Sequence, residues 1–186
     1  MGRIVVTEFI SVDGVIEDPG GAEDYEHGGW TFQFNAGPEF EKFKYEELQA
    51  SDAQLLGRIT YDGFAKAWPS IEGEFGDKMN SMPKYVVSTT VEHPEWNNTT
   101  VIRGDIADEV RKLKEQYERD ILIAGSARLV QSLIEQDLGD ELRLMVFPIL
   151  LGTGKRLFGD TSDVKRLQLA ETKPLGDGVT ILTYRR

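Results

Sequence analysis

Three short segments of the sequence combine residue types that bind phosphate. The clearest is the turn Gly125-Ser126-Ala127, which an apolar strand at residues 121–125 delivers to the start of a helix. Glycine allows backbone to approach a phosphate, and Ser126 can cap the helix or donate to the phosphate. Free N–H groups and the helix dipole favour an anion at such a helix N-terminus. An ordinary capped strand–helix turn is the alternative interpretation.

Two further strand ends have similar residues. Gly57 follows a strand and is itself followed by Arg58 and Thr60, a cation and a hydroxyl, while another strand ends in Ser88 and Thr89. Ligands of open α/β sheets bind at the carboxyl edge of the strands. The three segments together therefore favour a phosphorylated cofactor, such as a nucleotide, that lies across the sheet, although the sequence has no G-x-G-x-x-G fingerprint.

One glycine-rich segment does not fit phosphate binding of the P-loop type. Gly152-Thr153-Gly154-Lys155 would need a glycine at position 149 and a hydroxyl residue at position 156, where Ile149 and Arg156 stand. A P-loop is therefore excluded.

Composition limits the classes of function. The chain has 186 residues, 40% of them hydrophobic, and a net charge of −11, which predicts one globular domain over residues 1–186. An acidic chain repels nucleic acid and anionic membranes, so neither is an expected partner, although a local basic pocket for a small anion remains compatible. There is no cysteine and only two histidines, which argues against thiol chemistry and a metal site. No signal or membrane-spanning segment is recognisable, so we expect a cytoplasmic protein.

The elements that position these segments alternate between strands and helices. Strands are expected at residues 3–10, 53–57, 84–88, 99–102, 121–125, 141–150, 166–172 and 179–184. Helices are expected at residues 38–51, from 58 onward, at 73–82, at 106–117 with Asp105 as its cap, and from 126 until Gly139 ends it. This order predicts an α/β sheet that is mostly parallel, with an antiparallel edge formed by the C-terminal strands.

The segment from Ser11 to Pro38 is unusually long for a connection inside a domain. Loops of this length are typically functional loops or lids, and a mobile surface loop is the alternative. The alternating aromatic residues Trp30, Phe32 and Phe34 favour a segment that covers something.

Five motifs occur in an order and spacing that resemble a known family. They are Ser11-Val12-Asp13-Gly14, Leu56-Gly57-Arg58-Ile59-Thr60-Tyr61, Ile123-Ala124-Gly125-Ser126, Asp140-Glu141-Leu142, and the segment from Pro148 to Phe158. Across essentially the whole chain, the sequence is similar to the riboflavin-biosynthesis reductase C-terminal domain family. The resemblance implies the three-layer dihydrofolate-reductase-like fold, NADPH as the hydride donor, a small-molecule substrate and a homodimer.

The resemblance also implies roles for individual residues. Those expected to contact NADPH are Gly57, Arg58, Thr60, Ser88, Thr89, Gly125, Ser126, Ala127 and Arg128. Ser11, Asp13 and Gly14 are expected beside the nicotinamide and the substrate. Independently of the resemblance, we expect Trp30 near the substrate. Arg58 favours NADP over NAD, because a guanidinium pairs well with the additional phosphate.

Two carboxylates are candidate proton donors. Asp13 is the candidate in riboflavin-type reductases, whereas Glu39, which precedes the pair Phe43-Lys44, matches the position used by folate reductases. Reduction of a C=N or C=O bond needs a proton, which a carboxyl with a raised pKa can supply or relay. For Glu39 the alternative is an acid placed at a helix N-terminus by the helix dipole.

The resulting hypothesis is an NADPH-dependent reductase of a pterin-like or riboflavin-precursor-like heterocycle. Such an enzyme would be similar to dihydrofolate reductase or to 5-amino-6-(5-phosphoribosylamino)uracil reductase. The fused zinc deaminase found in many riboflavin-pathway reductases needs cysteines, which this chain lacks. The alternative is a module of the same fold that binds a nucleotide without turnover.

Overall fold

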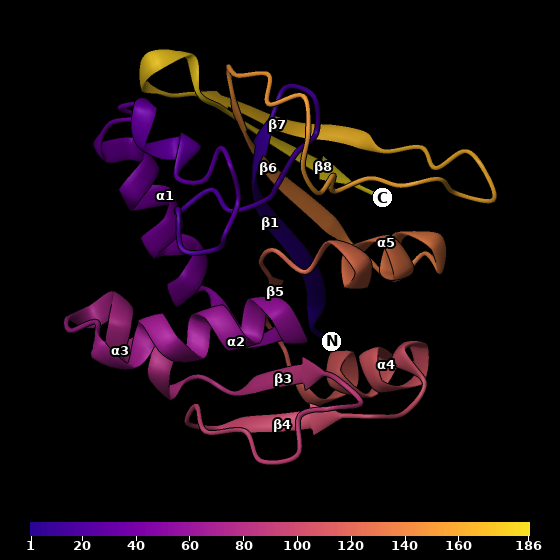
Figure 1. Cartoon of the computed structure of the whole chain (residues 1–186). Coiled ribbons are helices and arrows are strands. Elements are labelled where there is room, and N and C mark those ends of the chain that lie inside the picture. The colour runs from indigo at the N-terminus through magenta and orange to yellow at the C-terminus, as the bar shows by residue number, and fades with distance from the viewer.

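An eight-stranded sheet forms the centre of the molecule, and the computed structural model describes residues 1–186 (Figure 1). The strand order is β4-β3-β2-β5-β1-β6-β8-β7. The strands are β1 (Arg3–Ser11), β2 (Ser51–Gly57), β3 (Lys84–Val87), β4 (Thr99–Ile102), β5 (Asp120–Ile123), β6 (Glu141–Phe147), β7 (Gln168–Pro174) and β8 (Thr180–Arg185). The helices are α1 (Pro38–Gln49), α2 (Arg58–Ala67), α3 (Glu74–Ser81), α4 (Ile106–Gln116) and α5 (Ala127–Glu135).

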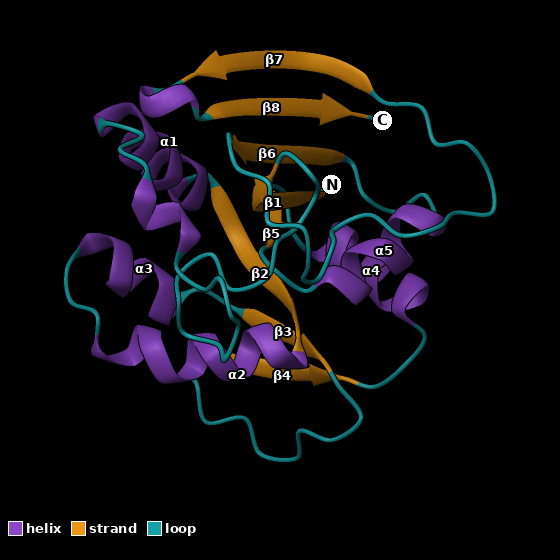
Figure 2. Cartoon of the chain, turned by 45° about the horizontal axis from the view of Figure 1, so that its top comes forward, coloured by secondary structure: helices purple, strands orange, loops and turns teal.

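The sheet is parallel from β4 to β6 and antiparallel at β8 and β7, as the sequence predicts. Figure 2 shows the antiparallel pair at one edge and β3 and β4 at the other. Strand β5 lies between β1 and β2, and all four of its residues are buried. This explains the apolar run Ile121-Leu122-Ile123, because helices cover both faces of a parallel sheet.

Helices α4 and α5 pack on one face of the sheet, and α1, α2 and α3 on the other (Figure 1). Val110 of α4 and Leu133 of α5 join Ile121 in one core cluster. Asp105 caps α4 as expected, since its side chain accepts the N–H of Asp108. None of the helices combines the length and the apolar content needed to cross a membrane.

Aromatic side chains fill the space between α1 and the sheet. Trp30 is completely buried, and its ring centroid lies 5.4 Å from that of Phe147 on β6. Phe9 of β1 lies 5.4 Å from Phe40 of α1, and Phe34 lies 5.6 Å from Phe147. Part of the long segment after β1 therefore folds into the core, which accounts for its aromatic residues.

Two element ends differ from the expectation. Strand β6 ends at Phe147, directly before Pro148, because proline has no N–H to continue a ladder. Helix α5 ends at Glu135, earlier than Gly139, because Asp137 adopts the left-handed conformation with φ of 59°.

Candidate functional site

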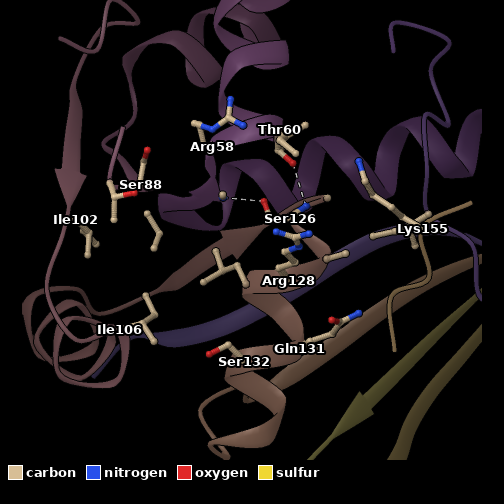
Figure 3. Close-up of a pocket in the computed structure, with 18 of the residues that line it drawn as sticks. Arg58, Thr60, Ser88, Ile102, Ile106, Ser126, Arg128, Gln131, Ser132 and Lys155 are labelled. Atoms are coloured by element: carbon tan, nitrogen blue, oxygen red, sulfur yellow. Dashed lines mark hydrogen bonds between the residues drawn. The ribbon is translucent and has the colours of Figure 1, made fainter. Parts of the chain in front are cut away.

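A cavity of about 810 Å³ lies at the carboxyl ends of β2, β3 and β5, where α2 and α5 begin (Figure 3). Its volume is within the range of sites for small molecules and cofactors. All nine residues expected to contact a cofactor line it, namely Gly57, Arg58, Thr60, Ser88, Thr89, Gly125, Ser126, Ala127 and Arg128. The fold therefore brings together segments that are far apart in the sequence.

Two reciprocal hydrogen bonds connect the beginnings of α2 and α5. The N–H of Ser126 donates to Oγ1 of Thr60 over 2.9 Å, and the N–H of Gly57 donates to Oγ of Ser126 over 2.9 Å. Figure 3 draws both bonds as dashed lines. We call these two hydrogen bonds the interlock. It holds the two helix N-termini side by side.

Glycine at position 125 is required by the interlock. Its φ is +57°, and a Cβ there would lie 2.6 Å from Oγ1 of Thr60. The sequence predicted instead that this glycine admits a phosphate. In the structure the space that a Cβ would need is taken by the Thr60 side chain.

Ser126 likewise has a different role from the one expected. Its side chain does not cap α5, because Oγ accepts from Gly57 and donates to the carbonyl oxygen of Ala124 over 3.1 Å. The N–H groups of Gly125 and Ser126 both have partners inside the protein. The donors that remain for an anion are the first N–H groups of α2 and α5, which have no partner within their own helices.

Cationic and hydroxyl side chains surround these helix N-termini. Arg58 is half exposed and pairs with Asp62 of the same helix over 2.8 Å, while Arg128 comes from the first turn of α5 (Figure 3). Ser88 is buried, and its Oγ accepts the N–H groups of Thr90 and Val91 over 3.1 Å. The Ser88 hydroxyl thus shapes the end of β3.

Arg103 is a lining residue that the sequence analysis missed. It follows β4, and its guanidinium donates to the carbonyl oxygen of Val91. Its position directly after a strand, at the same sheet edge as the other three segments, was the signal that could have identified it.

The other end of the cavity is formed by the loop after β1 and by the segment around residue 155. Ile16, Glu17, Glu23, Lys155 and Arg156 line it. Oε2 of Glu17 accepts the N–H of Lys155 over 2.8 Å, and Val15 forms a bridge with Arg156. This end therefore carries carboxylates as well as cations.

Asp13 does not fit the proton donor that the resemblance suggested. Its carboxylate accepts from Oγ of Ser11 over 2.6 Å and from the N–H groups of Leu151 and Gly152 over 3.2 and 2.8 Å. The hydrogen bond from Ser11, together with the two backbone donors, lowers the pKa of Asp13 to about 2. The group is ionised at neutral pH, and it joins the loop after β1 to the segment after β6.

The other residues expected near a substrate do not line the cavity. Ser11 is buried, and its Oγ accepts the N–H of Val15. Gly14 has φ of +83°, and its carbonyl oxygen accepts the N–H of Leu157. Trp30 is in the aromatic core, where its indole N–H donates to the carbonyl oxygen of Glu17 over 2.8 Å. These three residues shape the loop that reaches the cavity instead of lining it.

Glu39 is also outside the cavity. It is exposed in the first turn of α1 and pairs with Lys173 of β7 over 3.0 Å. The hydrogen bond and the charge of Lys173 lower its pKa, opposite to the shift expected of a proton donor. This agrees with the alternative interpretation, a helix N-terminal acid.

One buried carboxyl next to the cavity was also missed by the sequence analysis. Glu8 of β1 is 4% exposed, and its Oε2 accepts the N–H of Gly125 over 3.0 Å. Burial raises its pKa well above the ordinary value of 4.5. The signal that could have identified Glu8 was its charge within the largely apolar strand β1.

Comparison with known proteins identifies the family. The RibD C-terminal domain matches residues 3–181 of the chain. The chain belongs to the RibD C-terminal domain family. The chain is also similar to the uncharacterized protein YyaP of Bacillus subtilis, with 31% identity over 187 residues that cover 98% of this chain and 94% of YyaP.

Solved structures agree with the fold of the RibD C-terminal domain family. A proposed riboflavin biosynthesis protein from Shewanella sp. PV-4 superposes with a TM-score of 0.79 at 24% identity and covers 99% of this chain and 98% of its own. Dihydrofolate reductase from Enterococcus faecalis superposes with a TM-score of 0.60 at 14% identity, and the match covers 99% of this chain and 96% of the reductase. The dihydrofolate-reductase-like architecture is therefore confirmed.

Proposed function

We propose that this chain is an NADPH-dependent reductase that transfers a hydride to a small heterocyclic substrate, either pterin-like or riboflavin-precursor-like. One observation carries the proposal: two interlocked helix N-termini and three of the four lining arginines, Arg58, Arg103 and Arg128, converge on one cavity of about 810 Å³. The related dihydrofolate reductase from Enterococcus faecalis was solved with NADP(H), which supports the choice of cofactor.

The donor set fits a dinucleotide that carries an additional phosphate. The diphosphate would lie on the first N–H groups of α2 and α5, where both helix dipoles favour negative charge. The 2′-phosphate would lie near Arg58 and Arg103, close to the hydroxyl groups of Thr89 and Thr90. When bound, NADPH supplies the hydride.

The substrate would occupy the end of the cavity formed by Ile16, Glu17, Glu23 and Lys155. Carboxylates at this end suit a substrate that presents N–H donors or a positive charge, as the amino groups of pterins and aminopyrimidines do. With Asp13 engaged in hydrogen bonds and Glu39 outside the cavity, Glu17 and Glu23 are the carboxyl groups that line this end of the cavity and would contact such a substrate.

A nucleotide-binding module without turnover is the second candidate. It is favoured by the aromatic side chains of Phe9, Trp30 and Phe40, which fill the space between α1 and the sheet and leave Glu39 at the surface. In this case the cavity binds the nucleotide but lacks a complete catalytic set.

The two candidates are separated by binding and turnover assays on the same preparation. Titration with NADPH and NADH should show micromolar binding and a preference for NADPH. Oxidation of NADPH, followed at its absorbance band, is then measured with a panel of pterins, flavins and aminopyrimidines. Turnover supports the reductase, and binding without any turnover supports the module. Absence of binding at millimolar NADPH contradicts both.

The homodimer expected from the sequence stays a prediction, which light scattering of the purified chain would test.

A further inference from the structure

Glu8 is a buried carboxyl directly behind the turn that leads into α5. It comes from the central part of β1, on the same sheet face as Val6 and Ile10, which belong to the core beneath α4 and α5. Its Oε2 accepts the N–H of Gly125 over 3.0 Å, while its Oε1 is buried without a hydrogen-bond partner. A buried, half-satisfied carboxyl is costly and calls for a role beyond packing.

The surroundings of Glu8 favour its neutral form. Burial is the largest influence and raises its pKa, and the charge of Glu47 raises it further; the N–H of Gly125 and the charge of Lys44 act in the opposite direction. Both charged residues belong to α1. The charges around the cavity are the cations Arg58, Arg103, Arg128, Lys155 and Arg156 and the carboxylates Glu17 and Glu23.

We propose that Glu8 is a positioning residue for the turn at Gly125, and that its carboxyl takes up a proton when a nucleotide diphosphate binds at the N-termini of α2 and α5. This inference rests on the proposed nucleotide site and adds a proton to its binding equilibrium. No bond other than the carboxyl O–H forms, and the proton comes from the solvent.

The physical argument is a linkage between two negative groups on opposite sides of one turn. The interlock places Ser126 against Thr60, so that the N–H of Gly125 is turned away from the helix N-terminus and toward Glu8. A diphosphate on the other side of this thin turn disfavours a second negative charge in a poorly solvated position. Proton binding at Glu8 therefore becomes easier when the nucleotide is bound, and by reciprocity the nucleotide binds more tightly when Glu8 is protonated.

The chain offers a matched pair of variants for the test. Glu8→Gln keeps the shape of the side chain and an oxygen that can accept from Gly125, but it cannot titrate. Glu39→Gln makes the same chemical change at an exposed carboxylate outside the cavity. NADP⁺ is the probe, and calorimetric titrations in buffers of different ionisation enthalpy count the protons taken up. The pH range of about 7 to 9.5 lies above the second ionisation of the 2′-phosphate, which is near 6.

The wild-type protein and Glu39→Gln should take up protons on binding NADP⁺, up to one per nucleotide, and their Kd should rise by up to about tenfold per pH unit above the pKa that Glu8 has in the free protein. Glu8→Gln should bind with no uptake and with a Kd that is independent of pH in this range. Equal uptake in wild type and Glu8→Gln, or none in the wild type, overturns the role of Glu8 and leaves the nucleotide site intact. Failure of the wild type to bind NADP⁺ overturns the proposed function itself, and the inference with it.

Carbon-13 NMR of the glutamate carboxyl groups keeps the test independent of whether Glu8→Gln folds. In the wild type, one Cδ resonance should titrate well above the others, and NADP⁺ should move its midpoint to higher pH. A midpoint that does not move when NADP⁺ saturates the site contradicts the proposal.

Discussion

Two neighbouring regions at the carboxyl ends of the parallel strands, one on each side of β1, are built in opposite ways. On the side of α5, the ends of β2, β3 and β5 carry glycines, hydroxyls and arginines, and a cavity of about 810 Å³ remains open between them. On the side of α1, the buried side chains of Trp30 and Phe147 pack with neighbouring aromatic rings. The side chains in the first region hydrogen-bond to turns, whereas those in the second pack against each other.

This difference separates the residues that should control binding from those that should control stability. The cavity depends on backbone donors that the interlock holds in place. The aromatic region contains no free donor directed at a ligand but buries large apolar side chains. Substitutions on the two sides should therefore affect different measured quantities.

The largest effect is expected for Trp30→Ala. Removal of this completely buried side chain leaves a large void, and the free energy of unfolding should fall by about 3–5 kcal/mol. The Kd for NADP⁺ of the folded fraction should stay within about threefold, because the hydrogen bond from Trp30 reaches the cavity at Glu17, at the end opposite to the N-termini of α2 and α5. Urea unfolding and fluorescence titration measure the two quantities. A normal stability, or a lost nucleotide affinity with stability retained, would show that the two regions are not independent.

Arg58→Ala should give the converse result. Loss of one charge-assisted contact to phosphate should weaken NADP⁺ binding by roughly tenfold to a hundredfold, and NAD⁺ binding much less. Stability should hardly change, since Arg58 is half exposed and its partner is Asp62 one turn along the same helix. Lys66→Ala, at the last turn of α2 and outside the cavity, is the control. Equal losses for NADP⁺ and NAD⁺ would argue against a contact with the 2′-phosphate.

Asp13 is expected to contribute to the pH dependence of the free energy of unfolding. Its pKa is lowered from 3.8 to about 2 in the folded chain, so the ionised form stabilises the fold above pH 4, and this contribution is lost as the pH falls toward 2. Asp13→Asn should be less stable than wild type at pH 5, with a difference that shrinks as the pH falls from 4 to 2. Thermal unfolding between pH 2 and 5 measures it. Parallel curves for the two proteins would mean that folding does not lower the pKa of Asp13, contrary to the effect expected of the hydrogen bonds from Ser11, Gly152 and Leu151.

The smallest effect is expected for Glu39→Gln. Because Glu39 is exposed, pairs with Lys173 and lies outside the cavity, NADP⁺ affinity and any reductase turnover should be unchanged. A substantial loss of turnover with unchanged nucleotide binding would restore Glu39 as a catalytic residue and would require α1 to move.

Local sequence patterns predicted the elements well, and they identified the turns after β2, β3 and β5 that line the cavity, but not the contacts that Gly125 and Ser126 make there. The buried strand β5 and its following helix follow from an apolar run and a turn residue, both visible within a few positions. No local pattern predicts the position of β5 between β1 and β2, which only the structure shows.

What could not be predicted depends on contacts between distant segments. Glu8 and Gly125 are 117 positions apart, and Ser126 and Thr60 are 66 apart. The same holds for Arg143, whose guanidinium contacts the buried carboxylates of Glu47, Asp120 and Glu141 on three different elements. Trp30 was assigned to a substrate for the same reason, because an aromatic residue in a long polar loop gives no indication of which surface it covers.

The insertion of β5 between β1 and β2 has a consequence for synthesis on the ribosome. Strand β1 emerges first, yet its neighbours in the sheet, β5 and β6, begin only at residues 120 and 141. The nascent chain therefore holds an apolar strand without a partner through most of translation, and such non-local pairing folds slowly and exposes the chain to aggregation. The cavity, whose lining extends from Ile16 to Arg156, can form only when nearly the whole polypeptide has left the tunnel.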